Sequence, residues 1–361
     1  MNLTRRELLL ATPALPALGA CASQTSQHRD KPVTTLAKEL GVCDVAYVLL
    51  KDGRPAPSVS VFGCDDANRS DSEKASSTDG IFQAASLTKP VIAFGALRLV
   101  LDGQLDLNSP VANYLPRGYR HFHNVLARSS TDASDLVSTK ALAAIPVATL
   151  LNHTSGLPNW ANGSLLTGSP AGEKWRYSGE GYMLLQAVIE AVAGMDIATY
   201  FDTQVFGLLG MRDSSLLWRD DLGPRVKTGR SASGKAQQVR WQVPVAAASL
   251  YTTATDYARF ISALLADQAL LSLTISNLVS VEPRLGLDWG YGWGVEHGDS
   301  GPLIWQWGNN PGFRSFAMAS LSTKDGFVLL TNSERGMPLA ASLARMLGPT
   351  NHNAFRFSMV S

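Results

Sequence analysis

Short apolar runs of strand length occur near both ends of this chain, whereas apolar residues at helical spacing fill its middle. The early runs lie at 46–50 and 59–62, and the late ones at 293–296, 303–307, 314–321 and 326–331. Segments of this length and composition are typical of β-strands. We therefore predict an α+β fold, in which both chain ends build one antiparallel sheet flanked by helices, with an all-helical lobe inserted.

These patterns set the expected segment boundaries. Residues 1–21 form a leader, 22–34 a polar tether, and 35–355 the folded body. Within that body we assign about 35–102 and 266–350 to the sheet lobe and about 103–265 to the helical lobe. A short strand at 80–85 precedes a predicted helix at 87–101, and a second helix at 338–347 closes the fold.

Composition limits the function classes. The 361 residues are 45% hydrophobic and 17% charged, which suits one large domain or two closely packed lobes. The formal net charge is +1, with charges of both signs scattered along the chain. Such a chain offers no electrostatic attraction to nucleic acid, so we expect a small-molecule substrate.

The leader resembles a bacterial export signal. Arg5-Arg6 precede an apolar stretch, 8–20, that is too short to span a bilayer and is interrupted by prolines. The arginine pair resembles a twin-arginine signal, and the segment ending in Cys21 resembles a lipoprotein processing box. The resemblance implies an exported protein of the periplasm, or a membrane-attached lipoprotein carrying its lipid on Cys21. The alternative is a chance arginine pair before an ordinary helix.

Cys43 and Cys64 flank a predicted hairpin with its turn at 52–55. Strand pairing about that turn would bring the two sulfurs close together. An oxidising compartment would permit a disulfide between them, whereas in the alternative both remain half-buried thiols.

The most informative chemical element is Ser86-Leu87-Thr88-Lys89. Residues three apart lie on one face of a helix. A buried lysine whose pKa is lowered can take the proton of a neighbouring serine hydroxyl and so activate it as a nucleophile. The alternative is a capping serine beside a surface lysine.

Several further segments follow in a characteristic order. They are 82–90 around the serine, 103–107 and 114–116 after its helix, Leu150-Leu151-Asn152-His153-Thr154-Ser155-Gly156-Leu157-Pro158, 209–214, 250–257 and 290–294. Together they resemble the β-lactamase-related serine hydrolases, which include class C β-lactamases, D-amino-acid peptidases and β-lactamase-like esterases. The resemblance implies that 35–355 is a catalytic domain of the β-lactamase and penicillin-binding-protein kind. Region 117–141 is longer than expected between its flanking motifs.

The resemblance also implies the remaining catalytic residues. Tyr177 occupies the tyrosine position of the family's Y-x-N loop and would relay protons, but Gly179 replaces the asparagine. Gln306-Trp307-Gly308 occupy the K-T-G position, where no cation stands. We expect 306–309 to bind substrate, with the backbone N–H groups of Ser86 and Asn309 as the oxyanion hole.

Histidines have no predicted catalytic or metal-binding role. The resemblance implies that His153 is a structural residue at a turn, the alternative being a Ser-His-Asp base. His121 and His123 are expected to stand alone in a polar loop, and no metal or organic cofactor is implied.

Taken together, these features predict a serine hydrolase that acts through an acyl-enzyme. An ester or small amide is favoured, because Gly179 and Gln306 replace groups that bind lactam or peptide ends. The alternatives are a β-lactamase or D-amino-acid peptidase, a non-catalytic envelope protein that binds cell-wall peptides, and a lipoprotein scaffold anchored at Cys21.

Overall fold

A nine-stranded antiparallel sheet forms the centre of the protein, as predicted. Our computed structural model describes residues 31–64, 80–125, 131–161, 163–237, 239–298, 300–348 and 351–360. The strand order is β10-β11-β12-β13-β14-β15-β1-β2, and β3 also pairs with β1. The strands are β1 (Asp44–Lys51), β2 (Arg54–Pro55), β3 (Val59–Phe62), β10 (Val279–Glu282), β11 (Leu287–Trp289), β12 (Gly294–Gly298), β13 (Gly301–Asn310), β14 (Phe313–Ser320) and β15 (Gly326–Thr331).

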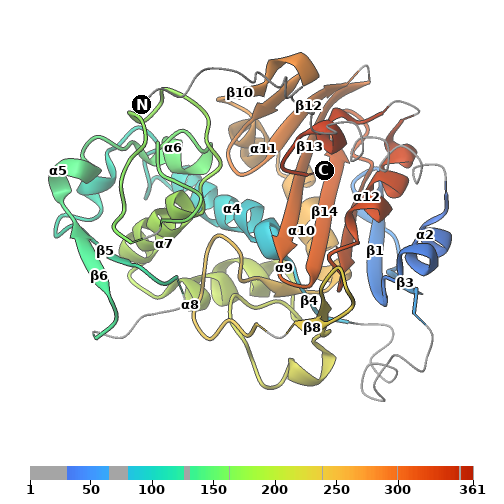
Figure 1. The fold of residues 1–361 in the computed structure, drawn as a ribbon. Coiled ribbons are helices and arrows are strands. Elements are labelled where there is room, and N and C mark those ends of the chain that lie inside the picture. Colours follow the sequence, from blue (N-terminus) through green and yellow to red (C-terminus); the bar gives the residue numbers. More distant parts are fainter. Residues whose placement is uncertain are drawn as a thin grey trace, which may run out of the picture.

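The two chain ends meet in the middle of this sheet. Strand β1 pairs with β15 in a register that sets Val48 opposite Val328. Figure 1 shows the blue N-terminal and red C-terminal elements side by side, with the green and yellow helical lobe beside them. The sheet therefore depends on contacts between residues almost 300 positions apart.

Helices account for most of the remaining structure. They are α2 (Val33–Leu40), α4 (Thr88–Leu101), α5 (Thr139–Leu142), α6 (Val147–Leu151), α7 (Gly179–Ala193), α8 (Ile197–Phe201), α9 (Gly207–Leu209), α10 (Ala254–Ala266), α11 (Gln268–Thr274) and α12 (Met337–Ala344). Short 3-10 turns include η2 (Ala85–Leu87) and η8 (Asn353–Arg356). Three small two-stranded sheets pair β4 (Phe82–Gln83) with β9 (Tyr251–Thr252), β5 (Tyr119–Phe122) with β6 (Ser134–Val137), and β7 (Gly229–Arg230) with β8 (Ala236–Gln237).

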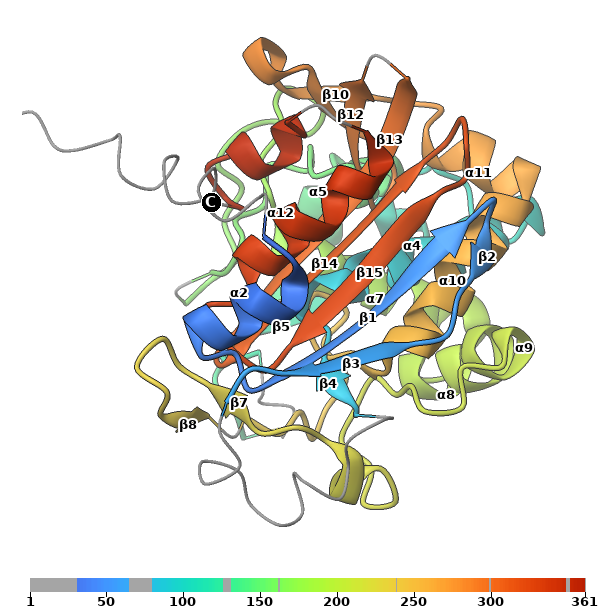
Figure 2. The same ribbon diagram turned by 90° about the vertical axis from the view of Figure 1, so that its right-hand side faces the viewer.

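The sheet is buried on both faces. Helices α2 and α12 pack on one face, and α10 packs on the other against β1 and β15 (Figure 2). Side chains of a strand alternate between the two faces, so Leu329 belongs to the core under α12 whereas Val328 belongs to the core shared with the helical lobe. This double burial explains why the late strands read as nearly continuous apolar runs.

Four predicted boundaries need correction. Helix α2 begins at Val33, inside the predicted tether. Helix α10, which we assigned to the helical lobe, instead covers the sheet. An amphipathic pattern shows that one face of a helix is buried, but it does not show what that face packs against. Strands β10 and β11 were not predicted, and the fold continues to the buried Val360, past the expected end. The leader, Cys21 and residues 22–30 lie outside the described residues.

The region at 117–141 contains a hairpin and a short helix. Strands β5 and β6 pair with each other, and α5 follows them. A second small hairpin, of β7 and β8, lies further along the chain.

Cys43 and Cys64 form the predicted disulfide. The hairpin of β1 and β3 sets the neighbouring Asp44 opposite Phe62, which brings the two cysteines into reach of each other. The alternative of two free thiols is wrong.

No single helix in the described ranges is long and apolar enough to cross a membrane. Helix α7 and the segment Ile197–Leu209 meet that criterion only as a pair, and they are bent by 73° relative to each other.

Candidate active site

Ser86 lies in a strained turn between β4 and α4. It occupies the 3-10 turn η2, so the α-helix begins at Thr88, one residue later than predicted. Ala85 has φ 51°, a left-handed conformation that is unusual for a residue with a Cβ atom. The turn is held from both sides, because Ser315 Oγ donates to Ala84 O at 2.7 Å and Thr88 Oγ1 donates to Ala85 O at 2.6 Å. The hydroxyl of Ser86 is thus presented on a fixed backbone.

Lys89 is buried one helical turn away from Ser86. Its Nζ lies 3.1 Å from Ser86 Oγ and donates to Ala247 O at 2.7 Å. Only 1% of the residue is exposed, so the alternative of a surface lysine is wrong. Burial lowers the pKa of Lys89 to about 7, which gives a neutral amine near neutral pH.

Tyr177 completes the group around Ser86. Its hydroxyl accepts a hydrogen bond from Gln306 Nε2 at 3.3 Å, and its ring centroid lies 4.7 Å from Lys89 Nζ. Burial raises the pKa of Tyr177, although hydrogen bonds with Ser86 and Gln306 oppose this shift. The phenol therefore keeps its proton at neutral pH and can donate it.

Gln306 lies beneath these groups rather than on the wall of the pocket. It is fully buried on β13, and its Nε2 also donates to Ser86 O at 3.2 Å. The predicted direct contact between Gln306 and substrate is therefore replaced by contacts with Ser86 and Tyr177. Nor does Arg314 line the pocket above Ser86: its Nη1 donates to the backbone oxygens of Asn310 and Phe313.

Gly308 allows β13 to approach the turn of Ser86. A Cβ atom at this position would collide with Ser315 Oγ and Ala84 O, and would lie 3.1 Å from Ala85 Cβ. We predicted that Gly308 binds substrate, but the structure gives it a steric role: only glycine lets the strand lie this close to the turn.

We expect Gly308→Ala to lower the free energy of unfolding by about 2–3 kcal/mol, because the new methyl group overpacks the contact with Ser315 and Ala84. Displacement of Ala84 also moves Ser86, so the rate of any reaction at Ser86 should fall more than tenfold. Thermal unfolding and initial rates measure the two effects. Gly298→Ala on β12 is the control, since its Cβ would meet first a flexible leucine carbon at 3.1 Å. Equal behaviour of the two variants would contradict this explanation.

A pocket of about 510 Å³ opens above Ser86. Its described lining residues are Ser86, Lys89, Val125, Asn159, Trp160, Tyr177, Val239, Trp241, Ala248, Trp307, Asn309, Asn310, Pro311 and Met359. Trp307 and Asn309 therefore lie where we predicted them, and Gly308 and Gln306 do not. Among these lining residues Lys89 is the one cation, and it already contacts Ser86 and Ala247.

Asn159 and Trp160 were missed by the sequence analysis. They directly follow the segment ending in Pro158, and Asn159 Oδ1 accepts the Gly179 N–H at 3.1 Å. A Cβ at Gly179 would lie 2.5 Å from Asn159 O and 3.0 Å from the Trp160 ring. An asparagine at 179 therefore has no room, and Asn159 brings a carboxamide to the pocket from the neighbouring loop.

His153 holds the loop that carries Tyr177. Its Nδ1 accepts the Ser178 N–H at 3.1 Å, and its ring centroid lies 4.4 Å from that of Tyr177. Burial, together with the nearby charge of Lys89, places the pKa of His153 well below its usual value. Its Nε2 has no hydrogen-bond partner among the described residues. His153 thus contacts the loop that carries Tyr177, and none of its described hydrogen bonds goes to Ser86. This is the arrangement of a structural residue and not of a Ser-His-Asp base.

Comparison with known proteins identifies the family and the fold. The family model described as Beta-lactamase matches residues 33–348. The chain belongs to the β-lactamase family. Among solved structures, a class C β-lactamase superimposes with a TM-score of 0.70 at 16% identity, covering 92% of this chain and 98% of that one. A D-stereospecific amidohydrolase from Streptomyces gives 0.66 at 18% identity, covering 91% and 99%. These likenesses confirm the predicted fold.

Two curated relatives of this β-lactamase-family chain carry different names. It is 28% identical to Esterase EstB of Burkholderia gladioli over 60% of its length, and 24% identical to Penicillin-binding protein 4* of Bacillus subtilis over 71%. The matches span 66% and 62% of those relatives. The chain thus covers slightly less than two thirds of each.

Proposed function

We propose that this protein is a serine hydrolase that cleaves an ester or small amide through an acyl-enzyme. Ser86 Oγ attacks the substrate carbonyl carbon while Lys89 Nζ takes the hydroxyl proton. The backbone N–H groups of Ser86 and Asn309 stabilise the oxyanion, and Tyr177 donates a proton to the leaving oxygen or nitrogen. Water then attacks the acyl-enzyme: the Tyr177 phenolate takes a proton from the water, and Lys89 returns its proton to Ser86 Oγ as the acid leaves, which restores all three groups.

The observation that carries this proposal is the pair formed by the half-buried Ser86 and the buried Lys89. A separation of 3.1 Å allows direct proton transfer, and a pKa of about 7 lets the amine act as a base near neutral pH. Burying a lysine is costly, and a pocket that only bound peptides would have no use for it. The pair therefore favours an enzyme over a non-catalytic binding protein or a scaffold.

The walls of the pocket favour an ester or small amide over a β-lactam or a peptide with a free carboxylate. Three tryptophans, Trp160, Trp241 and Trp307, offer apolar surface to an acyl or alkyl group. A carboxylate would need a cation to pair with, but the one cation among the described lining residues is Lys89, which already contacts Ser86 and Ala247. The relative named Esterase EstB agrees with this preference.

Parallel assays on a short-chain p-nitrophenyl ester and a chromogenic cephalosporin test the proposal. We expect a higher kcat/KM for the ester. Faster cephalosporin turnover would instead support the β-lactamase alternative, and release of a C-terminal D-amino acid from a peptide would support the peptidase one. A protein that turns over none of these, and that a fluorophosphonate does not label, would support the non-catalytic alternative.

Gln306 is proposed as a positioning residue. We expect Gln306→Leu to lower kcat about tenfold with little change in KM, because the donor to Tyr177 is lost while the pocket wall is unchanged. Gln306→His, which keeps an N–H donor, should restore much of the rate. A rise in KM at constant kcat, or failure of the histidine to restore the rate, would argue against this role.

We also propose that the protein is exported, as Arg5-Arg6 and the segment before Cys21 suggest. The disulfide between Cys43 and Cys64 supports an oxidising compartment. Fractionation of cells, with mass spectrometry of the mature N-terminus, tests export and lipidation at Cys21. Full-length protein in the cytoplasm would contradict the proposal.

A further inference from the structure

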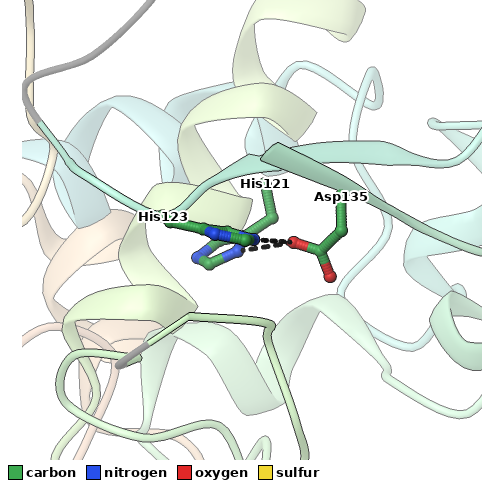
Figure 3. A group of neighbouring side chains, drawn as sticks. All are labelled: His121, His123 and Asp135. Atoms are coloured by element: carbon green, nitrogen blue, oxygen red, sulfur yellow. Dashed lines mark hydrogen bonds and ion pairs between the residues drawn. The ribbon is translucent and has the colours of Figure 1, made fainter. Parts of the chain in front are cut away.

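Two histidines and an aspartate converge on the hairpin of β5 and β6, outside the catalytic pocket. His121 and His123 are two residues apart in extended chain, so their side chains leave the same face. Asp135 on β6 lies directly opposite His121, and the His123 N–H continues the pairing by donating to Ala133 O. Both rings point at the carboxylate (Figure 3). The prediction that these histidines stand alone in a polar loop is therefore wrong.

The separations suit the coordination of a small metal ion. His121 Nδ1 lies 3.2 Å and His123 Nε2 3.1 Å from Asp135 Oδ1, and the three ligand atoms all lie within 4.8 Å of one another. Zinc bonds of 2.0–2.2 Å in a tetrahedron place neighbouring ligand atoms about 3.3 Å apart. Each histidine nitrogen thus lies from the carboxylate oxygen at nearly the spacing that a shared ion would require.

A buried carboxylate supports the first of these ligands from behind. His121 Nε2 lies 3.2 Å from Glu180 Oε2, and the two side chains are 3% and 7% exposed. Histidines that bind metals commonly donate their second ring N–H to a carboxylate, which fixes the ring and its tautomer. With its proton on Nε2, His121 presents the lone pair of Nδ1 toward Asp135 and His123.

We propose that His121, His123 and Asp135 bind one divalent transition-metal ion, with Glu180 as the positioning carboxylate. Two imidazole nitrogens and one carboxylate favour zinc or a similar ion over magnesium and calcium, which prefer oxygen ligands. The side chains of His123 and Asp135 are each 33% exposed, so the ion has access from solvent and water can complete its coordination.

The site joins the hairpin to the loop that carries Tyr177. Glu180 lies in the first turn of α7, three residues after Tyr177, and its Oε1 accepts the Ala161 N–H at 2.9 Å. Two pocket-lining residues lie close to this network in the chain: Val125 is two residues after His123, and Trp160 directly precedes Ala161. A bound ion would therefore hold together the segments that carry Val125 and Trp160 at the edge of the pocket. This role does not depend on which substrate the pocket accepts.

Metal binding can be measured without an activity assay. Full-length protein stripped with a chelator is titrated with Zn²⁺ by calorimetry and with Co²⁺ by visible absorption, and thermal unfolding is recorded with and without Zn²⁺. We expect one equivalent of each ion, the intense visible bands of low-coordinate Co²⁺, and a higher Tm with Zn²⁺. His123→Ala and Asp135→Asn should weaken binding at least 100-fold, and Glu180→Gln roughly 10- to 100-fold.

His297→Ala is the matched control, because His297 pairs with Asp288 at 2.7 Å on the surface without being part of a described ligand group of three. It should bind zinc as the unaltered protein does. Zinc affinity that is equal in the His123, Asp135 and His297 variants would show adventitious binding, and no saturable binding would show a hydrogen-bonded cluster without a metal. Either result overturns the proposal.

Discussion

Replacement of Ser86 by alanine is expected to lower kcat/KM for a p-nitrophenyl ester at least about 10³-fold. The attacking oxygen is lost, whereas the pocket walls and the oxyanion donors remain. Alanine should fit at position 86, because the change removes only the hydroxyl oxygen. The buried part of the turn, formed by Ala84 and Ala85, is left unchanged. Initial rates give the loss, and intact-mass measurement after fluorophosphonate treatment shows whether the adduct disappears with it.

A serine far from the pocket provides the control for this variant. Ser272 lies exposed on α11, and Ser272→Ala should keep the activity and the fluorophosphonate adduct of the unaltered protein. If Ser86→Ala retained more than a tenth of the rate, or was still labelled, another nucleophile would have to be found. Loss of metal binding at His121 and His123 is not expected in either variant, so the two proposals fail separately.

The catalytic pair could be predicted from the sequence because its geometry is local. Ser86 and Lys89 are three residues apart, and any helical turn brings such residues to one face. That Lys89 is buried, however, follows from the approach of Ala247, which is 158 residues away. Local spacing thus predicted which residues meet, whereas the lowered pKa of the base depends on distant packing.

The residues of the pocket walls could be predicted from the sequence only in part. Asn159 and Trp160 directly follow a recognised motif and could have been proposed from that position alone. Trp241 and Met359 reach the pocket from segments without any recognisable pattern, and only the packing of the chain brings them there. Gln306 was placed on the correct strand, but its face could not be predicted, because a shift of one residue in strand register turns every side chain to the other face.

The hairpin at 119–137 was missed for a related reason. Its strands are four residues each, Tyr-Arg-His-Phe and Ser-Asp-Leu-Val, and neither alternates between apolar and polar residues as a half-buried strand does. Without the partner strand, Asp135 could not be placed beside His121. Clusters of this kind become visible only when strand pairing is known.

Replacement of Lys89 by methionine is expected to abolish activity and to stabilise the fold, most strongly at acidic pH. Ester turnover should fall at least about 10³-fold, because no other base lies within the described contacts of Ser86. In the unaltered protein, kcat/KM should rise with pH through about 7, as Lys89 becomes neutral. Initial rates between pH 5 and 9 measure both effects.

The same lysine makes the stability of the unaltered protein depend on pH. Its pKa is about 7 in the fold and 10.5 as an ordinary lysine, so between these values the unfolded chain binds more protons and stability rises with pH. Below pH 7 the full cost of the buried charge is present. The gain in unfolding free energy from Lys89→Met should thus be roughly 2–3 kcal/mol larger at pH 6 than at pH 9. Denaturant titrations of both proteins at the two pH values measure it. Lys140→Met, at an exposed lysine on α5, should show no such difference. A gain independent of pH would mean that Lys89 is not the buried base that its place beside Ser86 requires.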